Sequence, residues 1–163
     1  MKKLVSFILA VLLVISIVPA AFAAENDTII REVSREVIYL DDGSYIVAIE
    51  YEHENPRSSR ATGTVTKSKN YVYHDAIGTE LYMLKLTASF AFTDQFVRAS
   101  SASYNYEIYK NLYRFGGGNA SYNSNYAFAT GTFYDSLGNR HRTLSITATC
   151  DSNGNVTFSL SNY

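Results

Sequence analysis

Cysteine is almost absent from this chain, since Cys150 is the only one among 163 residues. A single thiol cannot form an intramolecular disulfide, so the disulfide framework that stabilises many small exported proteins is excluded. Tryptophan is missing and proline occurs only twice. The fold must therefore be stabilised by apolar burial, for which the chain offers 14 tyrosines and 9 phenylalanines.

Positive charge is not in excess either. The chain carries 14 Lys and Arg residues against 15 Asp and Glu residues, a formal net charge of −1. A protein that binds nucleic acid needs a basic surplus to neutralise phosphates. We therefore expect no nucleic acid among its partners.

Only one apolar run is long, and it lies at residues 4–18. Lys2 and Lys3 precede it, and the small residues Ala21 and Ala23 follow it with the spacing that signal peptidase requires. This pattern predicts a cleaved secretory signal peptide at residues 1–23 and a secreted, extracellular mature protein. No second run of membrane-spanning length follows in the sequence, so no membrane span is expected in the mature protein.

Apolar and polar side chains alternate along most of the remaining chain. In residues 82–92 the even positions are apolar, whereas the odd positions include Lys85, Thr87 and Ser89. Residues 143–150 repeat the pattern, with four Thr or Ser residues on one side. A period of two is typical of half-buried strands. Eight or nine such strands, about a dozen residues apart, predict an all-β antiparallel sandwich, for which we expect an immunoglobulin-like arrangement.

Turn residues divide the chain into three predicted parts, of which the signal peptide is the first. Residues 24–60 are expected to form an N-terminal β-hairpin, with its turn at residues 41–44, followed by a linker. The linker is polar, contains Pro56, and includes Arg57-Ser58-Ser59-Arg60, a sequence open to proteolysis. Residues 61–163 are expected to form the core of the β-sandwich.

A glycine- and asparagine-rich stretch at residues 110–125 is predicted to be a long irregular loop and the best candidate for a binding site. Its tyrosines and amides combine rigid contact area with adaptable hydrogen bonding, which favours a surface glycan or a peptide as partner. The candidate binding residues are Tyr113, Phe115, Asn119, Tyr122 and Tyr126. The alternative is a flexible connection whose aromatic side chains alternate into the core.

No motif indicates catalysis, a metal site or a cofactor. None of the three histidines has further ligands at metal-site spacing, and no Gly-x-Ser-x-Gly nucleophile elbow occurs. Glu50, Glu52 and Glu54 alternate along one strand face, where solvated charges on an edge strand would discourage aggregation. We therefore predict a non-enzymatic protein without a cofactor or a metal.

The lone cysteine has two interpretations. Cys150 shares one side of its predicted strand with Leu144, Ile146 and Ala148, which favours burial as a small apolar residue. The alternative is an intermolecular disulfide, which electrophoresis with and without reductant would reveal.

Five segments of the chain carry a family resemblance, namely residues 35–45, 61–64, 100–103, 108–109 and 147–155. On these segments the chain resembles a group of small secreted all-β proteins, largely of Gram-positive gut bacteria. The group has no assigned function and offers no catalytic residues to carry over. The resemblance covers most of the predicted mature chain and implies an all-β fold.

The same resemblance points to differences between this chain and the group. Members carry tryptophans where this chain has Tyr82 and Tyr113, and a second cysteine near Ala99, so this chain has lost a bridge to Cys150. Simple alternation puts Ala99 on the side opposite Tyr104. A β-bulge or a shifted alignment is needed to bring it to the core side.

Three functions from different classes are compatible with the sequence. The first is a non-enzymatic binding or interaction module at the cell surface or in the medium, which predicts an exposed aromatic patch around residues 113–126. The alternative is a secreted antimicrobial or toxin-like protein. The third is a hydrolase, which requires a concave pocket lined by a carboxylate or histidine with a perturbed pKa.

Overall fold

The computed structural model describes residues 28–54 and 63–163. The predicted signal peptide and the segment from Arg57 to Arg60 lie outside the described residues. In the part of the chain that is described, no helix is long and apolar enough to span a membrane.

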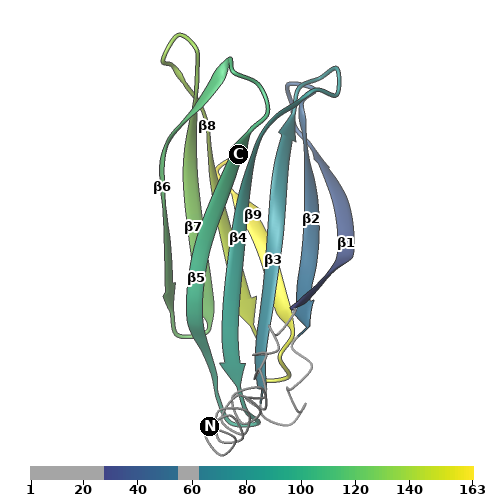
Figure 1. Cartoon of the computed structure of the whole chain (residues 1–163), viewed down its shortest axis with the longest axis vertical. Helices are drawn as coiled ribbons and strands as arrows, with labels where there is room; N and C mark the ends of the chain where they lie inside the picture. The colour runs from purple at the N-terminus through teal and green to yellow at the C-terminus, as the bar shows by residue number, and fades with distance from the viewer. Residues whose placement is uncertain (1–27, 55–62) are drawn as a thin grey trace, which may run out of the picture.

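In residues 28–54 and 63–163, nine antiparallel strands form two sheets (Figure 1). The first sheet has the order β1-β2-β3-β4-β5 and the second the order β6-β7-β8-β9. The strands are β1 (Ile29–Tyr39), β2 (Tyr45–Glu54), β3 (Gly63–His74), β4 (Glu80–Phe92), β5 (Val97–Ile108), β6 (Tyr113–Asn123), β7 (Tyr126–Asp135), β8 (Arg140–Cys150) and β9 (Val156–Ser161). The predicted all-β antiparallel architecture and the expected strand number are confirmed.

The connectivity differs from the immunoglobulin-like arrangement that the sequence led us to expect. An immunoglobulin sandwich interleaves its strands between two sheets. Here consecutive strands pair within each sheet, and only the connection from β5 to β6 passes from one sheet to the other. The physical reason is that each remaining connection described between consecutive strands is a short hairpin turn, which joins adjacent antiparallel strands. The predicted first hairpin, β1 and β2, pairs with β3 and so belongs to the five-stranded sheet.

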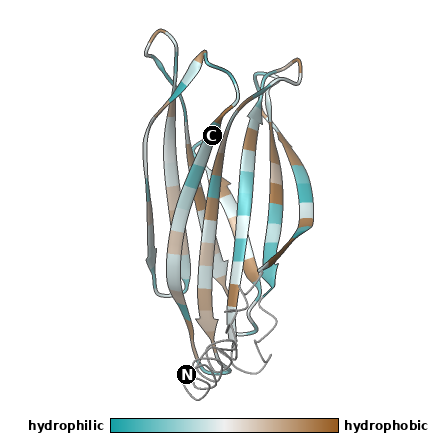
Figure 2. Ribbon diagram, viewed as in Figure 1, coloured by the Kyte–Doolittle hydropathy of each residue, from teal (hydrophilic) through white to brown (hydrophobic). Residues whose placement is uncertain are grey.

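The core lies between the two sheets and follows the predicted alternation. On β4 the side chains at positions 82, 84, 86, 88 and 90 are fully buried. On the second sheet the matching core positions are Ala127, Ala129 and Phe133 on β7 and Leu144, Ile146 and Ala148 on β8. The two sheets approach each other closely at Gly131, where an added Cβ would lie only 2.8 Å from Leu84 Cδ1 of the first sheet. Apolar bands recur along the strands in Figure 2.

The glycine-rich stretch is a strand and not the predicted loop. Its residues form β6, which pairs with β7 along its whole length and carries a bulge at Gly116. Glycine usually weakens a strand because it has no side chain to pack. In β6 neighbouring aromatic rings occupy the missing volume, since a Cβ on Gly116 would lie 2.1 Å from the Tyr134 ring and one on Gly118 would lie 2.9 Å from Phe115 Cζ.

A second bulge lies in β5 and places Ala99 in the core. Ser101 pairs with Ser89, whereas Ala99 pairs with Phe90, so Ser100 is the extra residue. The slip moves Ala99 to the same face as Phe90, where it is 2% exposed. The bulge that was needed to reconcile Ala99 with the core side is therefore present.

Three of the hairpin turns share one construction. Asp75, Asp135 and Asp151 each open a turn that has a glycine three residues later, with φ between 80° and 88°. In each turn the aspartate carboxylate accepts hydrogen bonds from the backbone amides two and four residues later. Such a turn followed by a left-handed glycine gives the strand twist that a hairpin requires.

Candidate functional site

The structure separates the five candidate residues of the predicted loop. Tyr113 and Phe115 lie on the core side of β6 at one end of the sandwich. The Tyr113 ring packs edge-on against Tyr82, with centroids 5.5 Å apart, and Phe115 stacks on Tyr106 at 3.9 Å. Burial, with smaller effects of nearby tyrosine and aspartate charges, raises the pKa of Tyr113. These two side chains therefore contribute to packing, as the alternative interpretation of the loop proposed.

Tyr122 and Tyr126 lie at the other end of β6 and β7, on opposite faces. Tyr122 pairs with Ala127, a core residue, whereas Tyr126 pairs with Asn123 on the face that points away from the first sheet. Asn119 pairs with Thr130 and also faces outward. The outer face of the second sheet thus brings Asn119 and Tyr126 together.

That outer face is lined by rows of hydroxyl groups, and we call it the hydroxyl face. The strand register aligns Thr132 with Thr143, and Thr130 with Ser145, across β7 and β8. Its hydroxyl residues are Ser121, Thr130, Thr132, Thr143, Ser145, Thr147, Thr149, Thr157, Ser159 and Ser161. Among the described strand positions on this face, the only charged residues are Arg114 and Arg140, which both pair with Tyr134 at one end.

Three aromatic residues on β7 also belong to the hydroxyl face. Tyr126, Phe128 and Tyr134 alternate with core residues and therefore point outward. The Tyr134 ring lies close over Gly116, and the Arg114 guanidinium is 5.4 Å from its centroid. At about 3.3 Å per residue, the three rings spread over roughly 26 Å of strand. Along β7 the aromatic residues therefore lie on both sides of the two threonines, Thr130 and Thr132.

Some of these hydroxyls hydrogen-bond to one another. Thr132 Oγ1 lies 3.1 Å from Thr143 Oγ1, and Thr130 Oγ1 lies 3.3 Å from Ser145 Oγ. A hydroxyl has one donor and two acceptor sites. Thr132 and Thr143 therefore keep capacity for a further hydrogen bond to a molecule above the sheet. Thr130 Oγ1 also donates to the Leu144 carbonyl, and the Ser145 hydroxyl is buried and also accepts from Asn162 Nδ2.

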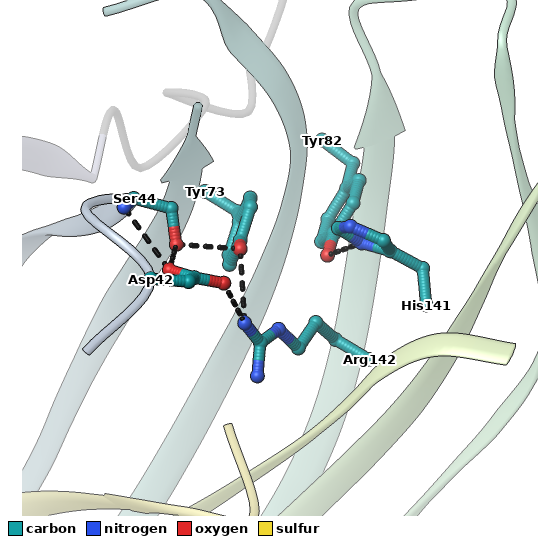
Figure 3. A network of polar contacts seen from close by, with 6 residues as sticks. All are labelled: Asp42, Ser44, Tyr73, Tyr82, His141 and Arg142. Atoms are coloured by element: carbon teal, nitrogen blue, oxygen red, sulfur yellow. Dashed lines mark hydrogen bonds and ion pairs between the residues drawn. The ribbon is translucent and has the colours of Figure 1, made fainter. Parts of the chain in front are cut away.

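A polar network joins the two sheets at the end that carries the β1–β2 turn (Figure 3). Arg142 of β8 binds the Asp42 carboxylate and lies 3.4 Å from the Tyr73 hydroxyl. Ser44 Oγ bonds both the Asp42 carboxylate and the Tyr73 hydroxyl. Hydrogen bonds from Ser44, followed by the charge of Arg142, lower the pKa of Asp42. These contacts connect the β1–β2 turn and β3 of the first sheet to β8 of the second, and we call the network the latch.

His141 adjoins this latch but does not complete a catalytic set. Its Nδ1 shares a 2.8 Å hydrogen bond with the Tyr82 hydroxyl, whereas Ser44 bonds only Asp42 and Tyr73. Burial and the charge of Arg142 lower the pKa of His141, so its imidazole is neutral at pH 7. Burial raises the pKa of Tyr82. The arrangement provides hydrogen-bonding groups and aromatic surface but no serine paired with a histidine base.

Two cavities share Arg142 and Tyr163 in their lining. The first, of about 370 Å³, is lined by Tyr39, Leu40, Asp41, Asp42, Arg142 and Tyr163. The second, of about 400 Å³, is lined by Arg140, His141, Arg142, Thr143, Asn162 and Tyr163. Within the described residues, no group of three His, Cys, Asp or Glu side chains could hold a metal ion.

The remaining titratable residues singled out from the sequence have structural partners. Cys150 is 2% exposed, on the core side as predicted, and burial raises the pKa of its thiol to about 11. Glu50 forms a half-buried ion pair with Lys67 at 3.0 Å and is not a solvated edge charge. His53 Nε2 lies 3.0 Å from Ser68 Oγ.

The sequence analysis did not identify Phe128 and Tyr134 as surface aromatic residues. It did identify one row of the hydroxyl face. The alternation in residues 143–150 places four Thr and Ser residues on one side of β8. That row is one strand wide. Only the register of β7 and β9 against β8 turns it into a surface.

Comparisons with known proteins assign no function to the chain. No family model matches the chain, and no curated protein matches it. A crystal structure of a hypothetical protein from Listeria monocytogenes EGD-e matches with a TM-score of 0.44 and 16% sequence identity. The match covers 83% of this chain and 98% of that one.

Proposed function

We propose that this chain is a secreted, non-enzymatic β-sandwich that binds a neutral glycan on the hydroxyl face. One observation carries the proposal: ten Thr and Ser residues face outward on the second sheet in register, together with three outward aromatic residues of β7. A neutral sugar presents hydroxyls at its rim and apolar CH groups on its ring faces. Hydroxyl rows and aromatic rings complement these two features.

The charge of the face favours a neutral glycan over a charged peptide. Its charged residues among the described strand positions, Arg114 and Arg140, are confined to the Tyr134 end. A peptide would also need an open strand edge or apolar pockets for its side chains. The hydroxyl face offers neither, because it is the broad surface of a sheet.

Export is supported by the amino-terminal sequence. Lys2 and Lys3, the apolar run at residues 4–18 and the small residues Ala21 and Ala23 form the signal-peptide pattern. An exported protein meets cell-surface polysaccharides directly. A glycan-binding surface is consistent with that location.

The test is a binding screen of the form lacking residues 1–23 against peptidoglycan and neutral polysaccharides, followed by titration with soluble oligosaccharides. Tyr126→Ala and Phe128→Ala are each expected to weaken binding by roughly five- to thirtyfold, the effect of removing an aromatic contact worth about 1–2 kcal/mol.

Tyr122→Ala is the matched control, since Tyr122 is similarly exposed on the same hairpin but belongs to the opposite face. It should bind as the parent protein does. Equal losses in Tyr122→Ala and Tyr126→Ala, or binding of peptides without any glycan, would contradict the proposal.

A further inference from the structure

The three aliphatic side chains with the largest exposed fractions in the described chain lie at one end of the sandwich (Figure 1). Ile77 is 89% exposed in the β3–β4 turn, Leu137 is 85% exposed in the β7–β8 turn, and Leu112 is 61% exposed in the β5–β6 connection. All three connections lie at the end opposite the N label in Figure 1, and apolar segments mark this end in Figure 2. We call Ile77, Leu112 and Leu137 the apolar tips.

The backbone beneath two of these tips is already hydrogen-bonded within its own turn. The Ile77 amide donates to Asp75 Oδ1 at 3.1 Å, and the Leu137 amide donates to Asp135 Oδ1 at 2.9 Å. The glycine amide of each turn donates to the aspartate carbonyl. A segment can leave bulk water at low cost only when such donors have partners. In both turns the amides two, three and four residues after the aspartate have such partners.

The third turn of the same construction shows that the apolar residue is not needed to form the turn. Asn153 occupies the position that Ile77 and Leu137 hold, and its amide donates to Asp151 Oδ1 at 2.9 Å. This turn lies at the opposite end of the sandwich, between β8 and β9. The choice of Ile and Leu at the other end is therefore a property of that surface, not of turn formation.

We propose that the apolar tips insert into the headgroup region of a lipid bilayer and dock this end of the protein on a membrane surface. The tips stand on three separate connections that belong to both sheets. A protein partner would need three matching pockets, whereas a bilayer is fluid and accepts single aliphatic side chains without complementary shape. Burial of each tip supplies the free energy of binding.

The charges at this end distinguish the proposed mode from attraction to anionic lipids. The cations near the tips are Lys110, Arg114, Arg140 and Arg142, and the carboxylates are Asp41, Asp42, Asp75, Glu80, Glu107 and Asp135. Backbone and side-chain hydrogen bonds lower the pKa values of Asp75 and Asp135, so both stay ionised at neutral pH. With carboxylates in excess, anionic lipid should not strengthen binding.

Vesicle sedimentation tests the proposal with the form lacking residues 1–23, because that apolar segment would itself bind lipid, and all nine strands begin after it. The parent protein is expected to sediment with phosphatidylcholine vesicles, and added phosphatidylglycerol should not increase the bound fraction. The double variant Ile77→Asn and Leu137→Asn copies the residue found in the third turn. It should lower the partition coefficient roughly a hundredfold, about tenfold per tip, with an unchanged melting temperature.

Two further variants serve as a control and as a direct measurement of insertion. Asn153→Leu puts an aliphatic side chain at the matching position of the opposite end, and it should neither raise parental binding by more than about twofold nor rescue the double variant. An environment-sensitive fluorophore on Leu137→Cys should shift to the blue with vesicles, since the native Cys150 is buried.

The proposal is overturned if the double variant binds as the parent does, if Asn153→Leu rescues it, or if binding requires anionic lipid. The glycan-binding variants Tyr126→Ala and Phe128→Ala lie away from the tips and should leave vesicle binding unchanged. Failure of one proposal is thereby distinguishable from failure of the other.

Discussion

Three consecutive glycines at the start of β6 should respond to alanine substitution in three different ways. Each one has a different reason to lack a side chain. A Cβ on Gly118 would lie 2.5 Å from the Thr130 carbonyl oxygen, which belongs to the backbone of β7. Gly117 has nothing within 4 Å of its Cβ position but has a φ of 133°. A Cβ on Gly116 would lie 2.1 Å from the Tyr134 ring.

The expected cost follows from what has to move. Gly118→Ala must displace the β6–β7 ladder itself and should destabilise the fold by about 2–3 kcal/mol. Gly117→Ala is expected to cost about 1–2 kcal/mol, because alanine is strained at that φ. In Gly116→Ala only the half-exposed Tyr134 ring must move. The reduced entropy of the unfolded chain offsets part of that loss, so the net change should stay within about 1 kcal/mol.

Urea unfolding of the three variants, followed by circular dichroism, measures the free energy of unfolding for each. The ranking should be Gly118→Ala, then Gly117→Ala, then Gly116→Ala, in order of decreasing loss. Gly116→Ala has a second expected effect, which is weaker glycan binding, since Tyr134 must leave its position on the hydroxyl face. Parental stability of Gly118→Ala would refute the pairing of β6 with β7. Such a result would favour the irregular loop that the glycine-rich sequence predicts.

Four further outcomes are expected. Leu84→Ala should cost about 2–5 kcal/mol in urea unfolding, since Leu84 is fully buried against the second sheet; a loss below 1 kcal/mol would contradict close packing of the two sheets. Cys150, with a pKa raised to about 11 by burial, should react with a disulfide reagent only after unfolding, and a dimer cleaved by reductant would argue against burial. Ala99→Cys should lose both free thiols under mild oxidation, because positions 99 and 150 are buried and their amides bond the same β6–β7 turn; two titratable thiols in denaturant would refute this. Hydrogen bonds from the Asn139 side chain and then from backbone amides lower the pKa of Asp135 in the folded protein. The ionised carboxylate therefore stabilises the fold fully above the pKa of an unfolded aspartate, about 3.9, and this contribution is lost as the pH falls through the pKa of the folded state. Asp135→Asn should therefore flatten the acid side of a profile of Tm against pH.

The strands could be predicted from the sequence because burial on one side is a property of each strand by itself. The even positions of β4 are apolar in the sequence and fully buried from 82 to 90 in the structure. Strand order is different, since alternation contains no information on which strand lies beside which. The immunoglobulin-like expectation failed at that step, and short turns between neighbours are what produce the sequential order.

The candidate site shows the same limit at the level of single residues. Tyr122 and Tyr126 are four residues apart, so simple alternation would place them on one face. The chain instead reverses at Ser124 and Asn125, with Ser124 at a φ of 50°, and Asn123 pairs with Tyr126. Partners across an antiparallel pair share a face, which leaves Tyr122 on the core side. A two-residue turn that the sequence did not reveal therefore decides which tyrosine can meet a ligand.

The two proposed surfaces depend on the sequence in different ways, and for that reason they can fail separately. When consecutive strands alternate in direction, every second connection falls at the same end of the sandwich, whichever sheet it belongs to. The turns that carry Ile77, Leu112 and Leu137 follow β3, β5 and β7, so strand number alone brings them together. The hydroxyl face requires more, because a slip of one residue between β7 and β8 would turn its threonines into the core. Altered register would abolish glycan binding and leave the apolar tips at their shared end.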